Sequence, residues 1–227
     1  MCRSVFRVVA VVGVVSGCAP PPDVEDGSGD LDPSRLDREE DGYPSAGARG
    51  YGTEVGERLA NSDGLQLRDC NGELRDFKQF FEVRDDGTHN RGVLVNIGAG
   101  WCGPCQEETL EFVDVYADYH EQGIELVQVL FQDWASQAPT QQFCEEWRTG
   151  QWEGESVDLD LAFPVFIDPI NDWTSIYLQD PASATPINLL VDANANIRFK
   201  SEGIKLRPDD LRTQLDLVIG APYDVPE

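Results

Sequence analysis

The sequence is poor in basic residues, in histidine and in long hydrophobic runs. Its 227 residues include 17 Lys and Arg against 42 Asp and Glu, for a formal net charge of −25. This balance argues against nucleic-acid binding and against a basic surface held on anionic lipid. Two histidines supply few imidazole ligands for a metal. The apolar run over residues 8–15 is far shorter than the about 20 residues that a membrane-spanning helix needs.

That apolar run is typical of a signal peptide. Arg3 and Arg7 precede it, and it ends at Val-Ser-Gly-Cys, residues 15–18, which resembles a bacterial lipobox. The resemblance implies cleavage before Cys18 and attachment of lipid to its sulfur. Residues 1–17 are therefore predicted to be a lipoprotein signal peptide, with an ordinary signal peptide as the alternative.

The lipoprotein interpretation also predicts where the protein resides. It places the chain in the bacterial cell envelope, facing the periplasm and attached to a membrane only through the lipid on Cys18. Ala19 stands where lipoproteins of the inner membrane carry Asp, and this favours the outer membrane.

The chain after Cys18 divides into two parts by composition. Residues 18–58 are rich in Pro, Gly, Asp and Glu, and are predicted to form an acidic flexible tether. Such a segment buries too little apolar surface to offset the entropy of ordering it. Residues 59–222 alternate short apolar runs with amphipathic stretches, which predicts one folded domain.

Hydrophobic periodicity predicts an α/β domain whose sheet is flanked by helices. Strands are expected over residues 65–68, 92–97, 124–131, 164–167, 187–191 and 197–200. Helices are expected over residues 74–81, 104–120, 140–147, 170–178 and 208–219. Asn71-Gly72 signals a hairpin turn near the start of the domain. The acidic stretch 149–162 is interpreted as a surface insertion.

The residues Trp101-Cys-Gly-Pro-Cys105 carry the predicted chemistry, because they follow a buried strand and open a helix. A helix N-terminus stabilises a thiolate, so Cys102 is predicted to be the nucleophile. Two intervening residues let Cys105 reach Cys102 and resolve a mixed disulfide. Pro104 suits the first helical turn, Gly103 leaves the rim open, and Trp101 offers an apolar surface to a substrate chain.

Half of a zinc site is the main rival interpretation of this motif. Zinc sites usually combine two close pairs of ligands. The remaining cysteines and histidines form no second close pair. The pattern therefore favours redox chemistry without a metal or another cofactor.

Residues 64–220 resemble the thioredoxin superfamily, and within it the TlpA/ResA-like, membrane-tethered branch. The resemblance implies a thioredoxin fold: a central mixed β-sheet between helices, here with an N-terminal β-hairpin extension. It also implies supporting or catalytic roles for Asn96 and Glu108, the latter in tuning thiol protonation. Thr185 and Pro186 resemble the cis-proline loop that faces the dithiol and binds substrate. For Glu108, a solvated acid in the first helical turn is the alternative.

Two further cysteines, Cys70 and Cys144, remain after the motif and Cys18 are set aside. Spare cysteines often pair in an oxidising envelope, so a structural Cys70–Cys144 disulfide is hypothesised. Spacing alone does not place the two within bridging distance, and free thiols remain the alternative.

The motif specifies dithiol–disulfide exchange but not its direction. Gly-Pro between the cysteines is the pair found in reducing thioredoxins. The resemblance implies a reductase of protein disulfides of the cytochrome c maturation type, supplied by a DsbD/CcdA-type transmembrane donor, and we expect a monomer. The alternatives are an envelope disulfide oxidase or isomerase, a peroxiredoxin-like peroxidase, and a non-catalytic thioredoxin-fold binding module.

Overall fold

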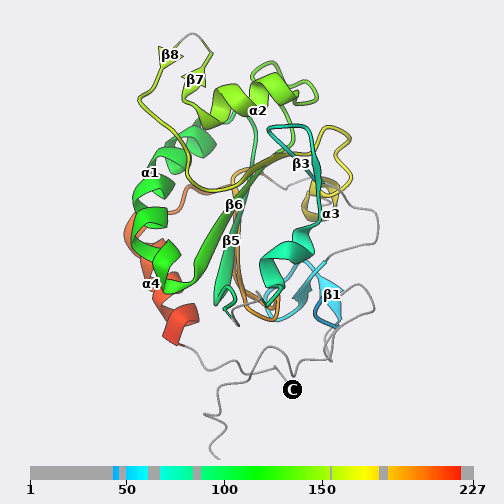
Figure 1. The fold of residues 1–227 in the computed structure, drawn as a ribbon, viewed down its shortest axis with the longest axis vertical. Coiled ribbons are helices and arrows are strands. Elements are labelled where there is room, and N and C mark those ends of the chain that lie inside the picture. Colours follow the sequence, from blue (N-terminus) through cyan, green and yellow to red (C-terminus); the bar gives the residue numbers. More distant parts are fainter. Residues whose placement is uncertain are drawn as a thin grey trace, which may run out of the picture.

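The structure, a computed structural model, describes residues 43–45, 50–60, 67–83, 88–153, 155–178 and 184–220. Its centre is a seven-stranded mixed sheet with the strand order β11-β10-β5-β6-β9-β3-β4 (Figure 1). The strands of this sheet are β3 (Leu67–Asp69), β4 (Leu74–Arg75), β5 (Gly92–Gly98), β6 (Ile124–Leu130), β9 (Val165–Ile167), β10 (Ile187–Asp192) and β11 (Ile197–Glu202). This arrangement confirms the predicted α/β class.

Helices cover both faces of the sheet, as Figure 1 shows. They are η2 (Phe77–Phe81), α1 (Gly103–Tyr119), η3 (His120–Gln122), α2 (Gln141–Arg148), α3 (Thr174–Tyr177) and α4 (Pro208–Gly220). Side chains from α1, α2 and α4 form one core with Leu94 and Leu126 of the central strands. Side chains from η2 and α3 form the other core with Val95 and Val127. The two cores follow from the alternation of side chains along each strand.

The two central strands, β5 and β6, position the cysteine motif. Every residue of both strands is buried, and they run parallel with Gly98 opposite Leu130. Strands buried on both faces have nearly continuous apolar sequences, which is why periodicity located both of them. The motif follows the C-terminal end of β5, and α1 begins at Gly103.

Part of the predicted flexible tether is folded, so the predicted domain boundary at residue 59 is too late. Strand β1 (Tyr51–Gly52) pairs in parallel with β2 (Arg58–Leu59). Tyr43 is 2% exposed, and its hydroxyl donates to the carbonyl of Leu59 at 2.9 Å. Leu59 in turn donates its N–H to the carbonyl of Ala195, in the turn between β10 and β11. One buried tyrosine and a short strand pair order this segment despite its acidic composition.

The rest of the predicted N-terminal organisation lies outside the described residues. This holds for the predicted signal peptide, for Cys18 and for the tether up to residue 42. No helix in the described part of the chain is long and apolar enough to cross a membrane.

The predicted N-terminal hairpin extension is confirmed, but the helix expected over residues 74–81 is wrong at its start. Strand β3 pairs antiparallel with both β4 and β9, so the hairpin extends one edge of the sheet. Leu74 belongs to β4, and only Phe77–Phe81 is helical, as a 3-10 helix capped by Asp76. The three buried phenylalanines of this helix produced the helical spacing.

Two other predicted segments are corrected. The stretch 149–162 contains a small hairpin, β7 (Gln151–Trp152) and β8 (Glu155–Ser156), and is more than a surface insertion. Trp152 and Leu161 are buried in the core, and Trp152 Nε1 donates to the carbonyl of Trp147 at 2.9 Å. The helix expected over residues 170–178 is reduced to the four residues of α3.

Candidate active site

The predicted dithiol lies at the N-terminus of α1 and is present as a disulfide between Cys102 and Cys105. Cys102 caps the helix, and its sulfur accepts the backbone N–H of Cys105 at 3.3 Å. Once the disulfide is reduced, the same N–H groups and the helix dipole stabilise a thiolate on Cys102. Both cysteines are buried, whereas Trp101, Gly103 and Pro104 are exposed around them. The geometry supports Cys102 as nucleophile and Cys105 as the partner beneath it.

Two glycines before the motif let the chain pack closely behind the cysteines. A Cβ on Gly98 would lie 3.3 Å from Cys105 Sγ and 3.8 Å from Asn96 Oδ1, so the sulfur and the amide share the space beside Gly98. A Cβ on Gly100 would lie 2.8 Å from backbone atoms of Asp133 and Trp134. The strand β5 and the motif are therefore pressed against the chain that follows β6.

Three amide side chains form a row across the sheet behind the dithiol. Asn188 on β10 and Gln128 on β6 both pair with Asn96 on β5, and all three are fully buried. Asn96 Nδ2 donates to Asn188 Oδ1 at 2.8 Å, and Gln128 Nε2 donates to Asn96 Oδ1 at 2.9 Å. The predicted supporting residue Asn96 is thus the centre of a hydrogen-bonded row.

Glu108, the predicted catalytic acid, is buried on α1 directly above this row, not solvated in the first turn. Its carboxylate accepts from Asn96 Nδ2 at 3.1 Å, from Asn188 Nδ2 at 3.1 and 3.2 Å, and from the backbone N–H of Leu206 at 2.6 Å. Burial raises the pKa of Glu108 from 4.5 to about 7, although these hydrogen bonds oppose the rise. A carboxyl group that titrates near neutral pH, three residues from Cys105 on the same helix, is suited to exchange protons with the thiols.

The predicted substrate-binding residues lie at the same end of β5 as the dithiol. The Thr185–Pro186 bond is cis, as predicted. Pro186 directly precedes β10, whose first residue Ile187 pairs with Ile97 next to the motif. Trp101 is 47% exposed, and its Nε1 donates to Gln132 Oε1 at 2.8 Å. The structure therefore brings all the residues predicted around the dithiol to one end of β5 and β10.

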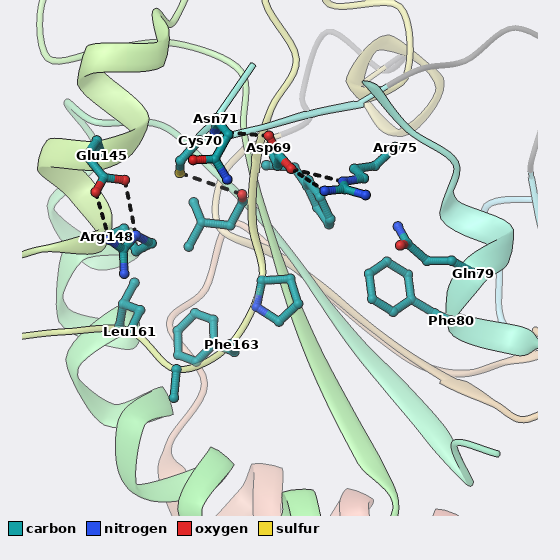
Figure 2. Close-up of a pocket in the computed structure, with 14 residues that line it drawn as sticks. Asp69, Cys70, Asn71, Arg75, Gln79, Phe80, Glu145, Arg148, Leu161 and Phe163 are labelled. Carbon is teal, nitrogen blue, oxygen red and sulfur yellow. Dashed lines mark hydrogen bonds and ion pairs between the residues drawn. The ribbon is translucent and has the colours of Figure 1, made fainter. Parts of the chain in front are cut away.

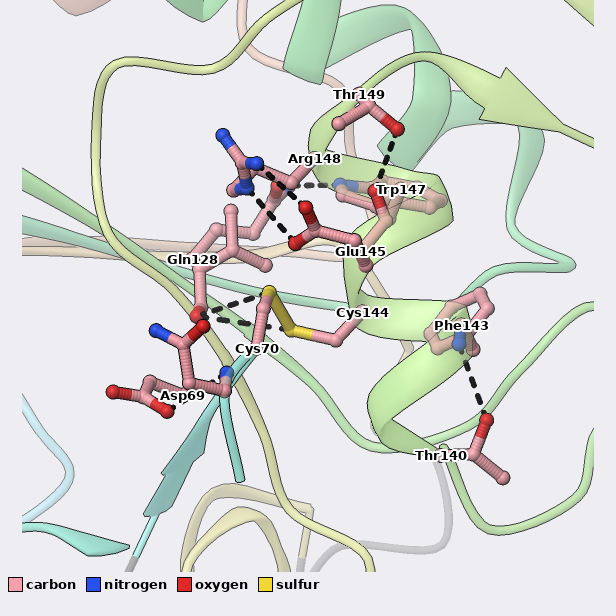
Figure 3. The surroundings of a disulfide bond; sticks show 12 residues. Asp69, Cys70, Gln128, Thr140, Phe143, Cys144, Glu145, Trp147, Arg148 and Thr149 are labelled. Atoms are coloured by element: carbon pink, nitrogen blue, oxygen red, sulfur yellow. Dashed lines mark hydrogen bonds and ion pairs between the residues drawn. A yellow bond between two sulfur atoms is a disulfide. The ribbon is translucent and has the colours of Figure 1, made fainter. Parts of the chain in front are cut away.

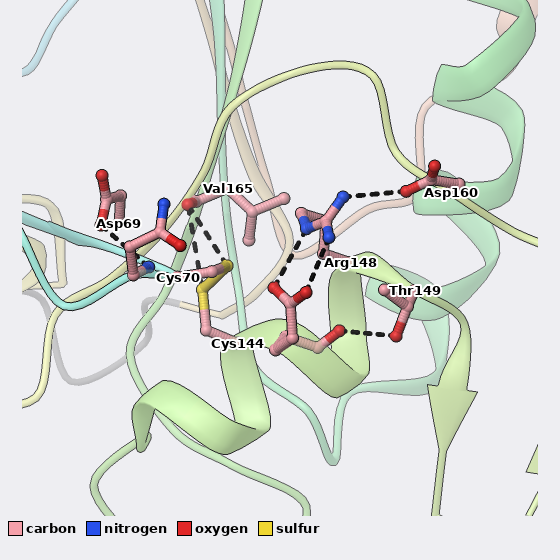
Figure 4. A network of polar contacts seen from close by, with 9 residues as sticks. Asp69, Cys70, Cys144, Arg148, Thr149, Asp160 and Val165 are labelled. Carbon is pink, nitrogen blue, oxygen red and sulfur yellow. Dashed lines mark hydrogen bonds and ion pairs between the residues drawn. A yellow bond between two sulfur atoms is a disulfide. The ribbon is translucent and has the colours of Figure 1, made fainter.

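The hypothesised Cys70–Cys144 disulfide is present and links the end of β3 to α2 (Figure 3). Its Cα atoms are 5.1 Å apart and 74 residues apart in sequence. Both sulfurs lie within 3.9 Å of the carbonyl oxygen of Val165 on β9. Figure 4 shows this bond next to Arg148, which is ion-paired with Glu145 and Asp160.

A cavity of about 430 Å³ lies beside this second disulfide and not at the Cys102–Cys105 pair (Figure 2). Phe80, Phe163 and the disulfide residue Cys70 contribute to its wall. Its two guanidinium groups, Arg75 and Arg148, already form ion pairs with neighbouring carboxylates. Within the described residues, no group of three or more His, Cys, Asp or Glu side chains is arranged to hold a metal ion.

Sequence reasoning missed four residues of the hydrogen-bonded network: Thr109, Gln128, Trp147 and Asn188. Gln128 interrupts the apolar run over residues 126–130 of β6, and Asn188 follows the first residue of β10. A polar side chain inside a fully buried strand needs a hydrogen-bond partner, so these interruptions were usable signals. Trp147 carried no such signal because a buried tryptophan is an ordinary core residue.

The fold and the buried dithiol define a thioredoxin-like protein, and comparison with known families agrees. A family model described as Redoxin matches residues 76–215, which is more than half of the chain. The chain therefore belongs to the Redoxin family, as a TlpA/ResA-like member of the thioredoxin superfamily.

Curated relatives with detectable similarity carry the name thiol-disulfide oxidoreductase ResA. The ResA protein of Oceanobacillus iheyensis is 31% identical over 114 residues, which cover 48% of this chain and 52% of that protein. ResA of Bacillus thuringiensis subsp. konkukian is 24% identical over 150 residues, 66% of this chain and 70% of the relative. The alignment with the Oceanobacillus protein thus spans about half the length of that relative.

Solved structures share the fold at low sequence identity. A Chlorobium tepidum protein solved as a candidate thiol:disulfide interchange protein DsbE aligns with a TM-score of 0.55 and 19% identity, covering 74% of this chain and 100% of that one. The thioredoxin domain of a Bacteroides vulgatus thiol-disulfide oxidoreductase gives a TM-score of 0.53 and 16% identity, covering 74% and 99%. These matches support the thioredoxin fold.

Proposed function

We propose that this protein is a thiol–disulfide oxidoreductase that works through Cys102 and Cys105. The observation that carries this proposal is the closed Cys102–Cys105 disulfide at a helix N-terminus, backed by the buried carboxyl of Glu108. The names of its ResA relatives describe the same class of reaction.

The proposed exchange proceeds in two balanced steps. The Cys102 thiolate attacks one sulfur of a substrate disulfide, which forms a mixed disulfide and releases the other substrate sulfur as a thiolate. The Cys105 thiolate then attacks Cys102 Sγ and releases the second substrate thiol. The substrate gains two electrons and two protons, and the protein is left with the disulfide seen in this structure.

The proposed direction is reduction of protein disulfides in the cell envelope, of the cytochrome c maturation type. The Gly-Pro pair between the cysteines and the ResA relatives support this direction. A transmembrane donor of the DsbD/CcdA type would return electrons to the Cys102–Cys105 disulfide. We also propose that lipid on Cys18 attaches the protein to the membrane, on its periplasmic side; the lipobox-like sequence at residues 15–18 supports this attachment.

Trapping of substrates tests the proposed exchange. Cys105→Ser removes the resolving thiol, so partner proteins should accumulate as mixed disulfides on Cys102, visible as adducts on non-reducing gels. The double variant Cys102→Ser/Cys105→Ser is the matched control and should give none. Cys102→Ser alone should abolish reduction of a model disulfide such as that of insulin. Adducts that persist in the double variant would contradict the assignment of Cys102.

The reduction potential tests the direction. A reductase should have a potential near that of thioredoxin, about −270 mV, whereas a value above about −180 mV would identify an oxidase or isomerase. Equilibration of the Cys70→Ala/Cys144→Ala variant with glutathione isolates the active pair for this measurement. Peroxide consumption that exceeds disulfide turnover would instead identify a peroxidase.

A further inference from the structure

A continuous line of hydrogen bonds connects Glu108 on α1, three residues after Cys105, to Trp147 on α2. Trp147 Nε1 donates to Gln128 Oε1 at 2.7 Å, and Gln128 Nε2 donates to Asn96 Oδ1 at 2.9 Å. Asn96 Nδ2 then donates to Glu108 Oε2 at 3.1 Å. The side chains of all four residues are fully buried, so no water competes for these bonds.

The direction of each bond in this line is fixed by chemistry. The indole N–H of Trp147 can only donate, so it selects the oxygen of the Gln128 amide. The NH₂ group of Gln128 therefore points at Asn96 and selects the oxygen of that amide as well. The NH₂ group of Asn96 is left facing Glu108 and Asn188. The indole N–H of Trp147 on α2 thus determines the orientation of the Asn96 amide beside the carboxyl of Glu108.

We propose that Gln128, held by Trp147, is a positioning residue of the dithiol site: it keeps the NH₂ group of Asn96 directed at Glu108. This proposal rests on the proposed thiol–disulfide exchange for its functional meaning, but the geometry it describes exists in the oxidised protein. Gln128 also donates to Thr109 Oγ1 at 2.7 Å, and Thr109 donates to the carbonyl of Cys105 at 2.8 Å. A second branch of the same amide therefore reaches the cysteine itself.

The second disulfide holds the far end of this line. Cys144 lies on α2 three residues before Trp147, and its bond to Cys70 ties that helix to the hairpin at the sheet edge. Figure 3 draws Gln128, Cys144 and Trp147 together. Trp147 is stacked on Trp134 and Trp152, with ring centroids 5.3 and 4.8 Å away, which fixes the plane of its indole.

Few charged groups among the described residues influence the pKa of Glu108. On its own helix, Glu111 raises the pKa of Glu108. From the loop after β11, Lys205 pairs with Glu107 and Glu111. The strands beneath present only the neutral amides of Asn96, Gln128 and Asn188, and the thiols of the motif titrate only after reduction. The orientation of Asn96 is therefore measurable through the titration of Glu108 in the oxidised protein.

The test is the side-chain carboxyl titration of Glu108, followed by carbon-13 NMR in the oxidised protein and assigned with Glu108→Gln. Gln128→Met keeps the side-chain volume and removes the amide, so Asn96 loses the donor that orients it. A hydrogen bond to the ionised carboxyl is weakened, and the Glu108 midpoint should move up by about one pH unit. Trp147→Phe keeps most of the ring and should move it up by about half as much. Gln142→Met, on the exposed face of α2, is the matched control and should leave it unchanged.

An unchanged Glu108 midpoint in folded Gln128→Met would overturn the proposal. If that variant does not fold, Trp147→Phe decides in the same way. The second readout is the pH profile of iodoacetamide alkylation of the reduced protein, where Gln128→Met should shift the profile in the wild-type background but not in Glu108→Gln. An equal shift in both backgrounds would show a general structural effect. Neither readout uses a protein substrate, so failure of the proposed function would not be mistaken for failure of this inference.

Discussion

Removal of the Cys70–Cys144 disulfide tests how much the cross-link between the N-terminal hairpin and α2 contributes to the stability of the domain. The double substitution Cys70→Ala/Cys144→Ala opens a loop closed over a sequence separation of 74 residues. In the chain-entropy description, a cross-link of this span stabilises the folded state by about 4 kcal/mol at 25 °C. We therefore expect the free energy of unfolding to fall by about that amount.

The active-site pair provides the matched control for this prediction. Cys102→Ala/Cys105→Ala removes the same number of buried sulfurs, but its disulfide spans only 3 residues. The same relation gives a cross-link contribution of about 2 kcal/mol for so short a loop. Urea unfolding of both non-reduced variants, followed by fluorescence of the buried tryptophans, measures the two losses. If the Cys70 and Cys144 variant loses no more stability than the active-site variant, the loop-entropy reasoning is wrong.

The remaining predictions concern the surroundings of the dithiol. Because the pKa of Glu108 is raised to about 7 in the folded protein, that state binds a proton the unfolded chain has released, and the stability of the oxidised protein should fall by about 3 kcal/mol as pH rises from 4.5 to 7. Glu108→Gln should lack this fall in urea unfolding at a series of pH values, and an identical pH dependence would refute the assigned pKa. Gly100→Ala should destabilise the protein by about 1–3 kcal/mol, because its methyl group meets backbone atoms at 2.8 Å. Gly103→Ala meets nothing within 4 Å, so equal thermal stability losses in the two variants would contradict this packing.

The sequence predicted the fold and the reactive pair because each rests on local signals. The central strands are mostly apolar, and the motif lies where a strand is followed by a helix. The folding of residues 43–45 and 50–58 was not predictable in this way, because Tyr43 gains its stability from Leu59 and Phe81, which are distant in sequence. The helix predicted over residues 74–81 was wrong at its start, because the spacing of three buried phenylalanines suits a 3-10 helix as well as an α-helix.

The residues of the site also differ in whether local sequence predicts them. Cys102, Cys105 and Pro186 were predictable because their residue types and spacing are distinctive. Gln128 and Asn188 acquire their roles only when β5, β6 and β10 align in register. Register across strands far apart in the sequence is a property of the folded sheet, and periodicity within one strand does not report it.

The bond between Leu59 and Ala195 has a consequence for how the molecule is oriented. It lies at the turn after β10, where Asp192 pairs with Gly92, whereas the dithiol follows Gly98 at the other end of β5. Seven residues of strand separate these two ends by about 20 Å. If the domain is held from its N-terminal side, the end of β5 that carries the dithiol therefore lies away from whatever holds it. A folded partner can then approach the dithiol from the end of β5 that carries it, so the attachment and the chemistry use different surfaces.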